Sequence, residues 1–154
     1  MSAAALAPPQ EFKRPESVLV VVYTRDCQTL LLERAWPVFW QSVTGSLEWP
    51  DEMPAQAARR ELFEETGISS EGGWRDWHLA RSFHILPEYR YLYGPGIVDN
   101  VEHLFSLELP APCEVRLDPA EHNRSRWLDL AQAVDSVWSW TNRAGLEQVA
   151  AELV

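Results

Sequence analysis

The chain has 154 residues, of which 46% are hydrophobic and 23% are charged, and its formal net charge is −10. This length and composition are typical of one globular domain with a substantial core. The acidic balance argues against general binding to nucleic-acid backbones, which needs a basic face, and no stretch reaches the roughly 18 apolar residues of a membrane span. We therefore expect neither a polynucleotide nor a membrane as partner.

The amino-terminal residues predict a flexible tail over residues 1–11, followed by one domain over residues 12–154. The first segment lacks the basic region and long apolar core of a signal peptide, so a cytoplasmic location is expected. Cys27 and Cys113 belong to no CxxC pattern, which favours free thiols over a disulfide or a metal site.

Three strands are predicted in the first third of the chain. Residues 17–23 form a continuous, β-branched apolar run that is typical of a buried strand. After a polar turn, residues 30–34 form the returning strand of a hairpin. Residues 39–45 form another short strand, which stops at Gly45.

The clearest helix is predicted over residues 54–66. Pro54 suits a first helical turn, and Gly67 occupies the position of a left-handed carboxyl-terminal cap. Three apolar residues at helical spacing are expected to face the core: Ala55, Ala58 and Leu62.

The remaining pattern indicates two alternating strands, then a short strand and two helices. The predicted strands cover residues 77–85, 101–109 and 126–130; residues 87–100 are irregular, one helix begins near Ala131, and an amphipathic helix covers residues 142–153. The order of strands, helix, strands and helices favours an α/β fold with a mixed sheet between helices.

The predicted helix 54–66 carries three glutamates within five residues: Glu61, Glu64 and Glu65. Like charges one turn apart destabilise a helix by a few tenths of a kcal/mol per pair. At about 100° per residue these side chains share one face, which we expect to be exposed. Clustered carboxylates suit Mg²⁺ or Mn²⁺, which assist the attack of water on phosphorus. The alternative is a solvated face with an Arg60–Glu64 ion pair.

Together with the residues around it, this cluster resembles the signature of the Nudix hydrolase family. The matching positions are Gly45, Glu52, Arg60, Glu61, Leu62, Glu64, Glu65, Gly67 and Ile68. The match is complete from Glu52 onward. Six residues separate Gly45 from Glu52, where the family usually has five, and we interpret this as a one-residue insertion in the loop.

The family resemblance implies an α/β/α sandwich with a mixed sheet and a divalent cofactor, Mg²⁺ with Mn²⁺ as a possible substitute. Glu61 and Glu65 would be the main metal ligands and Glu64 a further one, while the backbone carbonyl of Gly45 would complete the shell. Arg60 would orient a glutamate through a salt bridge, and Glu52 would reach Arg60 or the metals. The resemblance assigns neither the general base nor the phosphorus attacked.

Nearly the whole chain, from about residue 12 to 153, also resembles the dihydroneopterin triphosphate pyrophosphohydrolases of folate biosynthesis. The segments that carry this resemblance include "FKRPESVLVVVY", "FWQSVTGSLE", "EHNRSRWLDL" and "WSWTNRAGLEQ". It implies hydrolysis of a small-molecule triphosphate, 7,8-dihydroneopterin triphosphate, to the monophosphate and pyrophosphate. The alternatives are a broader (d)NTP pyrophosphohydrolase, such as one acting on dATP, and a non-catalytic nucleotide-binding module. All the carboxylates of the Nudix signature (here called the Nudix box) are retained, which disfavours the non-catalytic nucleotide-binding module.

The same resemblance implies a substrate site and a further metal ligand, Glu121. The implied substrate-binding residues are Lys13, Arg34, Thr44, Phe83, His84, Ile85, Leu86 and Ser139. Cationic side chains suit phosphate oxygens. Structural alternatives remain for several of them: Lys13, Arg34 and Glu121 as plain surface charges, Thr44 as a strand end, and Ser139 as a helix cap.

Overall fold

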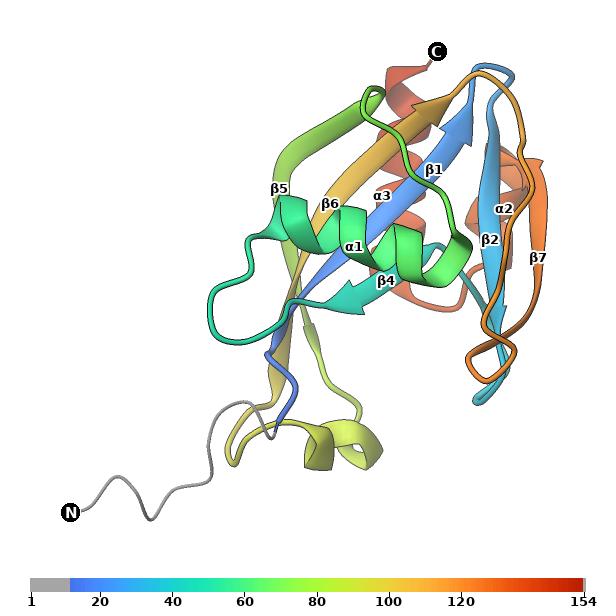
Figure 1. The fold of residues 1–154 in the computed structure, drawn as a ribbon. Helices are drawn as coiled ribbons and strands as arrows, with labels where there is room; N and C mark the ends of the chain where they lie inside the picture. The colour runs from blue at the N-terminus through green and yellow to red at the C-terminus, as the bar shows by residue number, and fades with distance from the viewer. Residues whose placement is uncertain (1–11, 154) are drawn as a thin grey trace.

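The computed structural model describes residues 12–153 (Figure 1). The elements are β1 (Glu16–Thr24), β2 (Gln28–Arg34), β3 (Trp40–Gln41), β4 (Val43–Ser46), α1 (Pro54–Thr66), β5 (Trp74–His84), the 3₁₀ helix η3 (Pro87–Leu92), β6 (Asp99–Leu109), β7 (His122–Asp129), α2 (Leu130–Ser136) and α3 (Trp140–Glu152). The predicted tail over residues 1–11 lies outside the described residues.

The centre of the fold is a mixed sheet in which β1 pairs with three other strands. β1 runs parallel to β6 and antiparallel to β2 and β4. β5 extends the sheet beyond β6, and β7 and β3 pair with β2. Helix α1 lies across one face, while α2 and α3 lie on the other (Figure 1). The α/β/α sandwich with a mixed sheet is thus confirmed.

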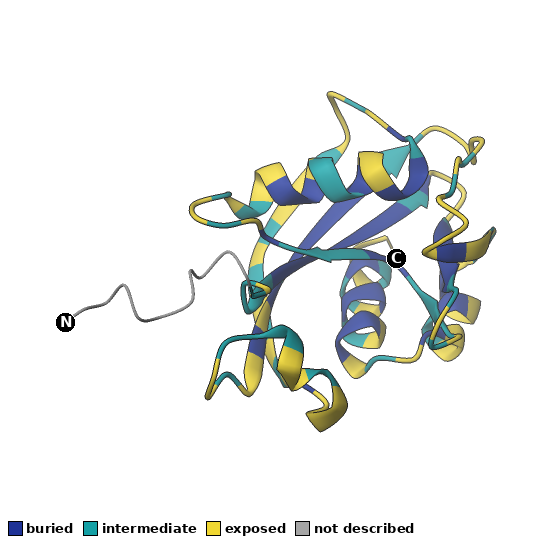
Figure 2. Cartoon of the chain, turned by 60° about the horizontal axis from the view of Figure 1, so that its bottom comes forward, coloured by how far each residue is buried: buried dark blue, intermediate teal, exposed yellow. Residues whose placement is uncertain are grey.

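Strand β1 is buried on both faces, which explains its continuous apolar sequence. Its two alternating sets of side chains enter two separate cores. Val18, Val20 and Val22 pack with Ala58 and Leu62 of α1. Leu19 and Val21 pack with Leu146 and Val149 of α3. Figure 2 shows the buried sheet and the exposed outer surfaces of the helices.

Helix α1 has the predicted bounds, and its apolar stripe differs from the prediction in one residue. Gly67 adopts the left-handed conformation with φ 75°, and its N–H donates to the Phe63 carbonyl. Ala55 is exposed, and Ala57 packs in the core instead. Leu62 and Ala58 face the core as predicted.

The single strand predicted over residues 39–45 is wrong, because the chain divides at Ser42. β3 pairs with β2, whereas β4 pairs with β1, so the residue between them has no strand partner. The N–H of Ser42 donates instead to the side chain of Asn142 on α3, over 2.9 Å. A local sequence pattern does not show such a change of partner.

Several other bounds also differ from the prediction. The strand predicted over residues 126–130 begins four residues earlier, at His122, and part of the segment predicted as irregular forms η3. Cys27 and Cys113 are free, as predicted, and both are exposed. Within residues 12–153 no helix is long and apolar enough to cross a membrane.

Candidate metal and phosphate site

The glutamates of α1 are not on an exposed face, as the sequence had indicated. Glu65 is only 8% exposed, and the Glu61 side chain is 14% exposed. Glu64 is the outer member, with 55% of its side chain exposed. The difference arises because strand β4 runs beneath this face of the helix, so two of the three carboxyl groups are enclosed between α1 and the sheet.

Gly45 allows this close approach of β4 to α1. A Cβ atom at this position would overlap with the carboxyl group of Glu61. Any side chain would therefore displace Glu61. The backbone of the preceding residue, Thr44, lies within hydrogen-bonding reach of Glu65. The loop and helix parts of the signature are thus in direct contact.

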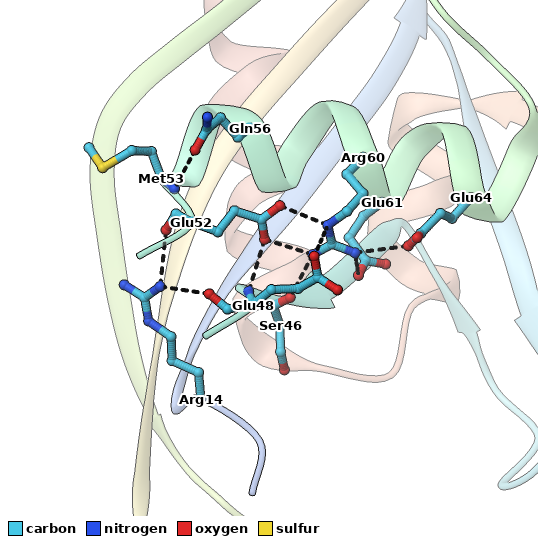
Figure 3. Close-up of polar contacts among 9 residues, drawn as sticks. All are labelled: Arg14, Ser46, Glu48, Glu52, Met53, Gln56, Arg60, Glu61 and Glu64. Atoms are coloured by element: carbon cyan, nitrogen blue, oxygen red, sulfur yellow. Dashed lines mark hydrogen bonds and ion pairs between the residues drawn. The ribbon is translucent and has the colours of Figure 1, made fainter. Parts of the chain in front are cut away.

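Arg60 offsets the repulsion among the glutamates (Figure 3). Its guanidinium donates two hydrogen bonds of 2.8 Å to the carboxylate of Glu52. It also donates to Glu61 and Glu64, each over 2.8 Å, and to the carbonyl of Ser46 over 3.0 Å. Charge-assisted and bidentate bonds of this kind are the strong ones. Arg60 therefore joins the loop, β4 and α1.

The loop with the extra residue is held by a second arginine, Arg14, which the sequence analysis did not single out. Arg14 donates to the carbonyls of Glu48 and Glu52, over 3.1 and 3.0 Å. The N–H of Glu48 donates to the Glu52 carboxylate over 2.9 Å. The insertion is therefore absorbed within the loop, and Glu52 still reaches Arg60. The FKRP segment contained the signal, but a contact 38 residues away is not visible in the sequence.

The enclosed carboxylates have perturbed pKa values. Burial raises the pKa of Glu65 well above its usual range, and the charges of Glu61 and Glu121 act in the same direction. Burial also raises the pKa of Glu61. In contrast, the hydrogen bonds from Arg60 hold the pKa of Glu52 low. Like charges in a desolvated place repel each other, and a proton or a bound cation relieves that repulsion.

The carboxylates fit a hard divalent cation in one specific respect. Oε1 of Glu65 is buried and has no hydrogen-bond partner, so a carboxylate oxygen is left over beside Glu61. Among residues 12–153, no three acidic, cysteine or histidine side chains are already gathered at ligand spacing. Glu61 and Glu64 each accept a hydrogen bond from Arg60 instead.

Glu121 lies near Glu65, Lys13 lies near Glu61 and Glu121, and Arg34 lies near Lys13. A register shift in the β2–β7 pair at Arg34 brings the 121–122 segment beside the end of β2, where the N–H of Ala35 donates to the Glu121 carbonyl over 2.8 Å. Desolvation and Arg34 lower the pKa of Lys13, while Glu61 and Glu121 raise it. Residues far apart in sequence thus place Lys13 next to the acidic cluster, with Arg34 close to Lys13.

Thr44 and Ser139 lie on β4 and at the start of α3. The hydroxyl of Thr44 donates to the Val18 carbonyl over 2.9 Å. Ser139 is the amino-terminal cap of α3, because its hydroxyl accepts from the N–H of Asn142 over 3.0 Å. The structural alternative for Ser139 is therefore correct, and it does not prevent the hydroxyl from contacting a ligand.

The four residues after Ser82 are not equivalent. Phe83 is half-buried on β5, opposite Asn100 of β6. His84 points to the other face and pairs with Asp99, both largely exposed. Ile85 is buried and Leu86 is exposed. Of this segment, the structure brings Phe83 to the same face of the sheet as α3.

Two polar residues on that face, Asn100 and Glu102, were not predicted as site residues from the sequence. Both are buried, on a strand whose other inward side chains are mostly apolar. The alternation Asn-Val-Glu at the start of β6 was the available signal. A buried carboxyl is uncommon unless it has partners.

Comparison with known proteins agrees with this geometry. The NUDIX domain family model matches residues 13–151. The chain is 39% identical over 142 residues to dihydroneopterin triphosphate diphosphatase of Escherichia coli strain K12, covering 89% of this chain and 93% of that protein. It is 37% identical over 145 residues to the protein of the same name from Haemophilus influenzae, covering 90% and 89%.

The solved structures that resemble the fold include the E. coli dihydroneopterin triphosphate pyrophosphohydrolase. It superposes with a TM-score of 0.82 at 39% identity, covering 89% of this chain and 95% of that one. A Nudix hydrolase structure from Listeria monocytogenes, at 22% identity, shares the fold with a TM-score of 0.77. On the family match, the identity and the retained box residues, this chain belongs to the Nudix family.

Proposed function

We propose that this protein is a metal-dependent pyrophosphohydrolase that converts 7,8-dihydroneopterin triphosphate to dihydroneopterin monophosphate and pyrophosphate. The observation that carries the proposal is the enclosed carboxylate cluster of α1, with an unpaired oxygen on Glu65, with Lys13 beside the cluster and with Arg34 close to Lys13. Carboxylates suit a divalent metal, and cations suit the phosphates that share it.

Glu61 and Glu65 would hold the metal, with Glu64, Glu121 and the carbonyl of Gly45 in support. Mg²⁺ is the expected ion and Mn²⁺ a substitute; when bound, it would polarise phosphate oxygens and supply water of lowered pKa. Arg60 and Glu52 would orient the ligands. The roles of Arg60 and Glu52 are supported by the two Arg60 hydrogen bonds to Glu52 and by the others to Glu61, Glu64 and the Ser46 carbonyl.

The substrate assignment is supported by the relatives at 37–39% identity, both named for dihydroneopterin triphosphate. The implied binding residues are Lys13, Arg34, Thr44, Phe83, His84, Ile85, Leu86 and Ser139. Lys13 and Arg34 would meet the triphosphate, and Phe83 and Ser139 the ring. A small-molecule substrate in the cytoplasm, rather than a polynucleotide, remains the prediction from charge and sequence.

A broader (d)NTP pyrophosphohydrolase, for example one acting on dATP, is the second candidate. The residues proposed to bind the metal and the phosphates would serve either substrate equally, since they do not contact the ring. The two candidates therefore differ only in how the ring is bound.

Release of phosphate, after pyrophosphatase coupling, separates them. Dihydroneopterin triphosphate is compared with dATP, dGTP and GTP in Mg²⁺. We expect kcat/KM for the pterin to be a hundredfold higher or more, equivalent to about 2.7 kcal/mol in transition-state binding. Equal values for the nucleotides would replace the pterin assignment by the broader one. Absence of turnover on every triphosphate would contradict the hydrolase itself.

A further inference from the structure

A buried polar set lies on the α3 face of the sheet, at the end nearest the start of α3. Its central member is Glu102 on β6, which is 9% exposed. Asn100, two residues earlier on the same strand, is 1% exposed. Neither residue belongs to the metal and phosphate site, and the roles assigned above use neither of them.

The neighbours of these two residues include groups proposed to bind the substrate. In the strand register, Glu102 lies opposite Ser17 on one side and Arg81 on the other, and Asn100 lies opposite Phe83. Paired residues of adjacent strands share a face, so these side chains are directed to the same side as α3. Phe83 is thereby placed next to the polar set.

Helix α3 closes the set from above the sheet. Thr141 lies within hydrogen-bonding reach of the Glu102 carboxyl. The hydroxyl of Thr141 is 3.0 Å from that of Ser139. A short chain of polar groups thus runs from Ser139 to Glu102.

The hydrogen-bonding capacity of the set is only partly used within the chain. The amide nitrogen of Asn100 donates to Ser17 over 2.8 Å, but its oxygen is buried without a partner. Burial raises the pKa of Glu102 to about 6, with Thr141 and Arg81 opposing the effect only in part. A buried acceptor without a donor is destabilising, and more so when it is charged. The Asn100 oxygen therefore lacks a donor, and the half-buried Phe83 and the buried carboxyl of Glu102 lie beside it.

We propose that Glu102, with Asn100 beside it, recognises the hydrogen-bond donor edge of the substrate's ring. That edge is the ring N–H and the adjacent exocyclic amino group of a 2-amino-4-oxopyrimidine, which pterins and guanine share. A carboxylate can accept both N–H groups at once. Adenine has no ring N–H at the corresponding position. The inference rests on the proposed function, because it concerns the ring of the same triphosphate.

The physical consequence is discrimination between rings. A site with buried polar groups rejects an analogue that cannot pair with them, because the groups are then left unsatisfied. Phe83 supplies apolar surface next to the acceptors, which suits a flat heterocycle. The preference for an amino-oxo ring over adenine is therefore assigned to Glu102 rather than to the metal site.

The test compares wild type, Glu102→Gln and Asn100→Ala on dihydroneopterin triphosphate, dGTP and dATP with Mg²⁺. Glu108→Gln is the matched control, since Glu108 lies further along the same strand and is partly exposed. We expect Glu102→Gln to lower kcat/KM at least tenfold on the two amino-oxo substrates and less than twofold on dATP. A smaller loss in the same order is expected for Asn100→Ala. The wild-type values for the pterin and for dGTP show which of the two rings the site serves.

An equal loss of kcat/KM on all three substrates in Glu102→Gln would mean that Glu102 only supports α3, and would overturn the inference. No loss of kcat/KM on any substrate would overturn it as well. Equilibrium binding of neopterin monophosphate, GMP and AMP in EDTA keeps the test independent of catalysis. Weaker binding of the first two to Glu102→Gln, with AMP unchanged, supports the inference even if wild type hydrolyses none of the triphosphates. Unchanged binding of all three would overturn it.

Discussion

The backbone of Gly45 lies against the carboxyl group of Glu61, so the Glu61 side chain alone fills the space between β4 and α1 at this point. A methyl group at position 45 would occupy the place of the carboxyl. Glu61 can move only by turning away, since its own backbone is fixed within the helix. The position of a proposed metal ligand thus depends on a residue 16 positions earlier in the chain.

Gly45→Ala should therefore impair catalysis far more than folding. The φ of Gly45 is not in the left-handed region, so alanine is not strained there. We expect kcat/KM to fall roughly a hundredfold, as for a displacement of about 1 Å in a reacting group, and the melting temperature to change little. Gly72→Ala is the control, since nothing lies within 4 Å of a Cβ at that position. Full activity of Gly45→Ala would contradict the role of Glu61.

Glu65→Gln should separate metal binding from stability. Glu65 is buried beside like charges, so loss of its charge should leave the melting temperature in EDTA unchanged or higher. Turnover should fall by about a thousandfold or more, and the rise in melting temperature on adding Mn²⁺ should disappear, because a main ligand is lost. Glu71→Gln, in an exposed loop, is the control. A persistent Mn²⁺-induced rise in Glu65→Gln would argue against Glu65 as a ligand.

Arg60 carries five hydrogen bonds to Glu52, Glu61, Glu64 and the Ser46 carbonyl. Arg60→Ala should lower the free energy of unfolding by about 2–3 kcal/mol, because it leaves partly buried carboxylates without a cation. Arg60→Lys should recover less than half of that loss, since a lysine cannot form the two-pronged contact with Glu52. Urea denaturation in EDTA measures both.

Arg59→Ala provides the comparison for Arg60. Arg59 is the preceding residue on the same helix and lies exposed over Trp74, donating to the Ser70 carbonyl. Its loss should cost less than about 1 kcal/mol. Equal destabilisation by the two substitutions would mean that Arg60 has no special role in holding the loop, β4 and α1 together.

The sequence predicted the local elements and the box, and failed where distant segments meet. The bounds of α1 follow from Pro54 and Gly67, which are local signals. The enclosure of Glu61 and Glu65 is not local, because it depends on the change of partner at Ser42, where the chain passes from β3, paired with β2, to β4, paired with β1. The roles of Arg14 and Asn142 in the fold likewise depend on contacts over 34 residues or more. The periodicity of the sequence predicts local elements and does not predict contacts between residues that far apart.

The pH dependence of stability should report on Glu102. Its folded-state pKa of about 6 lies above the usual 4.5, so the folded protein binds this proton more tightly than the unfolded chain. Proton uptake by Glu102 therefore stabilises the folded protein fully below about pH 4.5, and this stabilisation is lost as the pH rises through 6. A difference of about 1.5 pH units corresponds to about 2 kcal/mol.

Replacing Glu102 by glutamine, which does not titrate, should stabilise the protein at neutral pH only. The unfolding free energy of Glu102→Gln minus that of wild type should increase by up to about 2 kcal/mol between pH 4.5 and 7.5. Glu108→Gln should show no comparable rise. Chemical denaturation at several pH values measures the difference, and a flat difference for Glu102→Gln would mean that its carboxyl titrates normally.

Ser139 has a structural role as the cap of α3, and the remaining question is whether its hydroxyl also meets the substrate. Ser139→Ala should lower stability by about 1 kcal/mol, because the N–H of Asn142 loses its acceptor. Ser139→Asn should keep the cap, since asparagine is as good a capping residue as serine. If the hydroxyl contacts the ring, both variants should raise KM for dihydroneopterin triphosphate about threefold or more, while only the alanine variant loses stability.

Ser136→Ala in α2, whose hydroxyl donates to the exposed Gln132 carbonyl, is the control. A KM that rises only in the alanine variant would show that Ser139 acts through the helix alone.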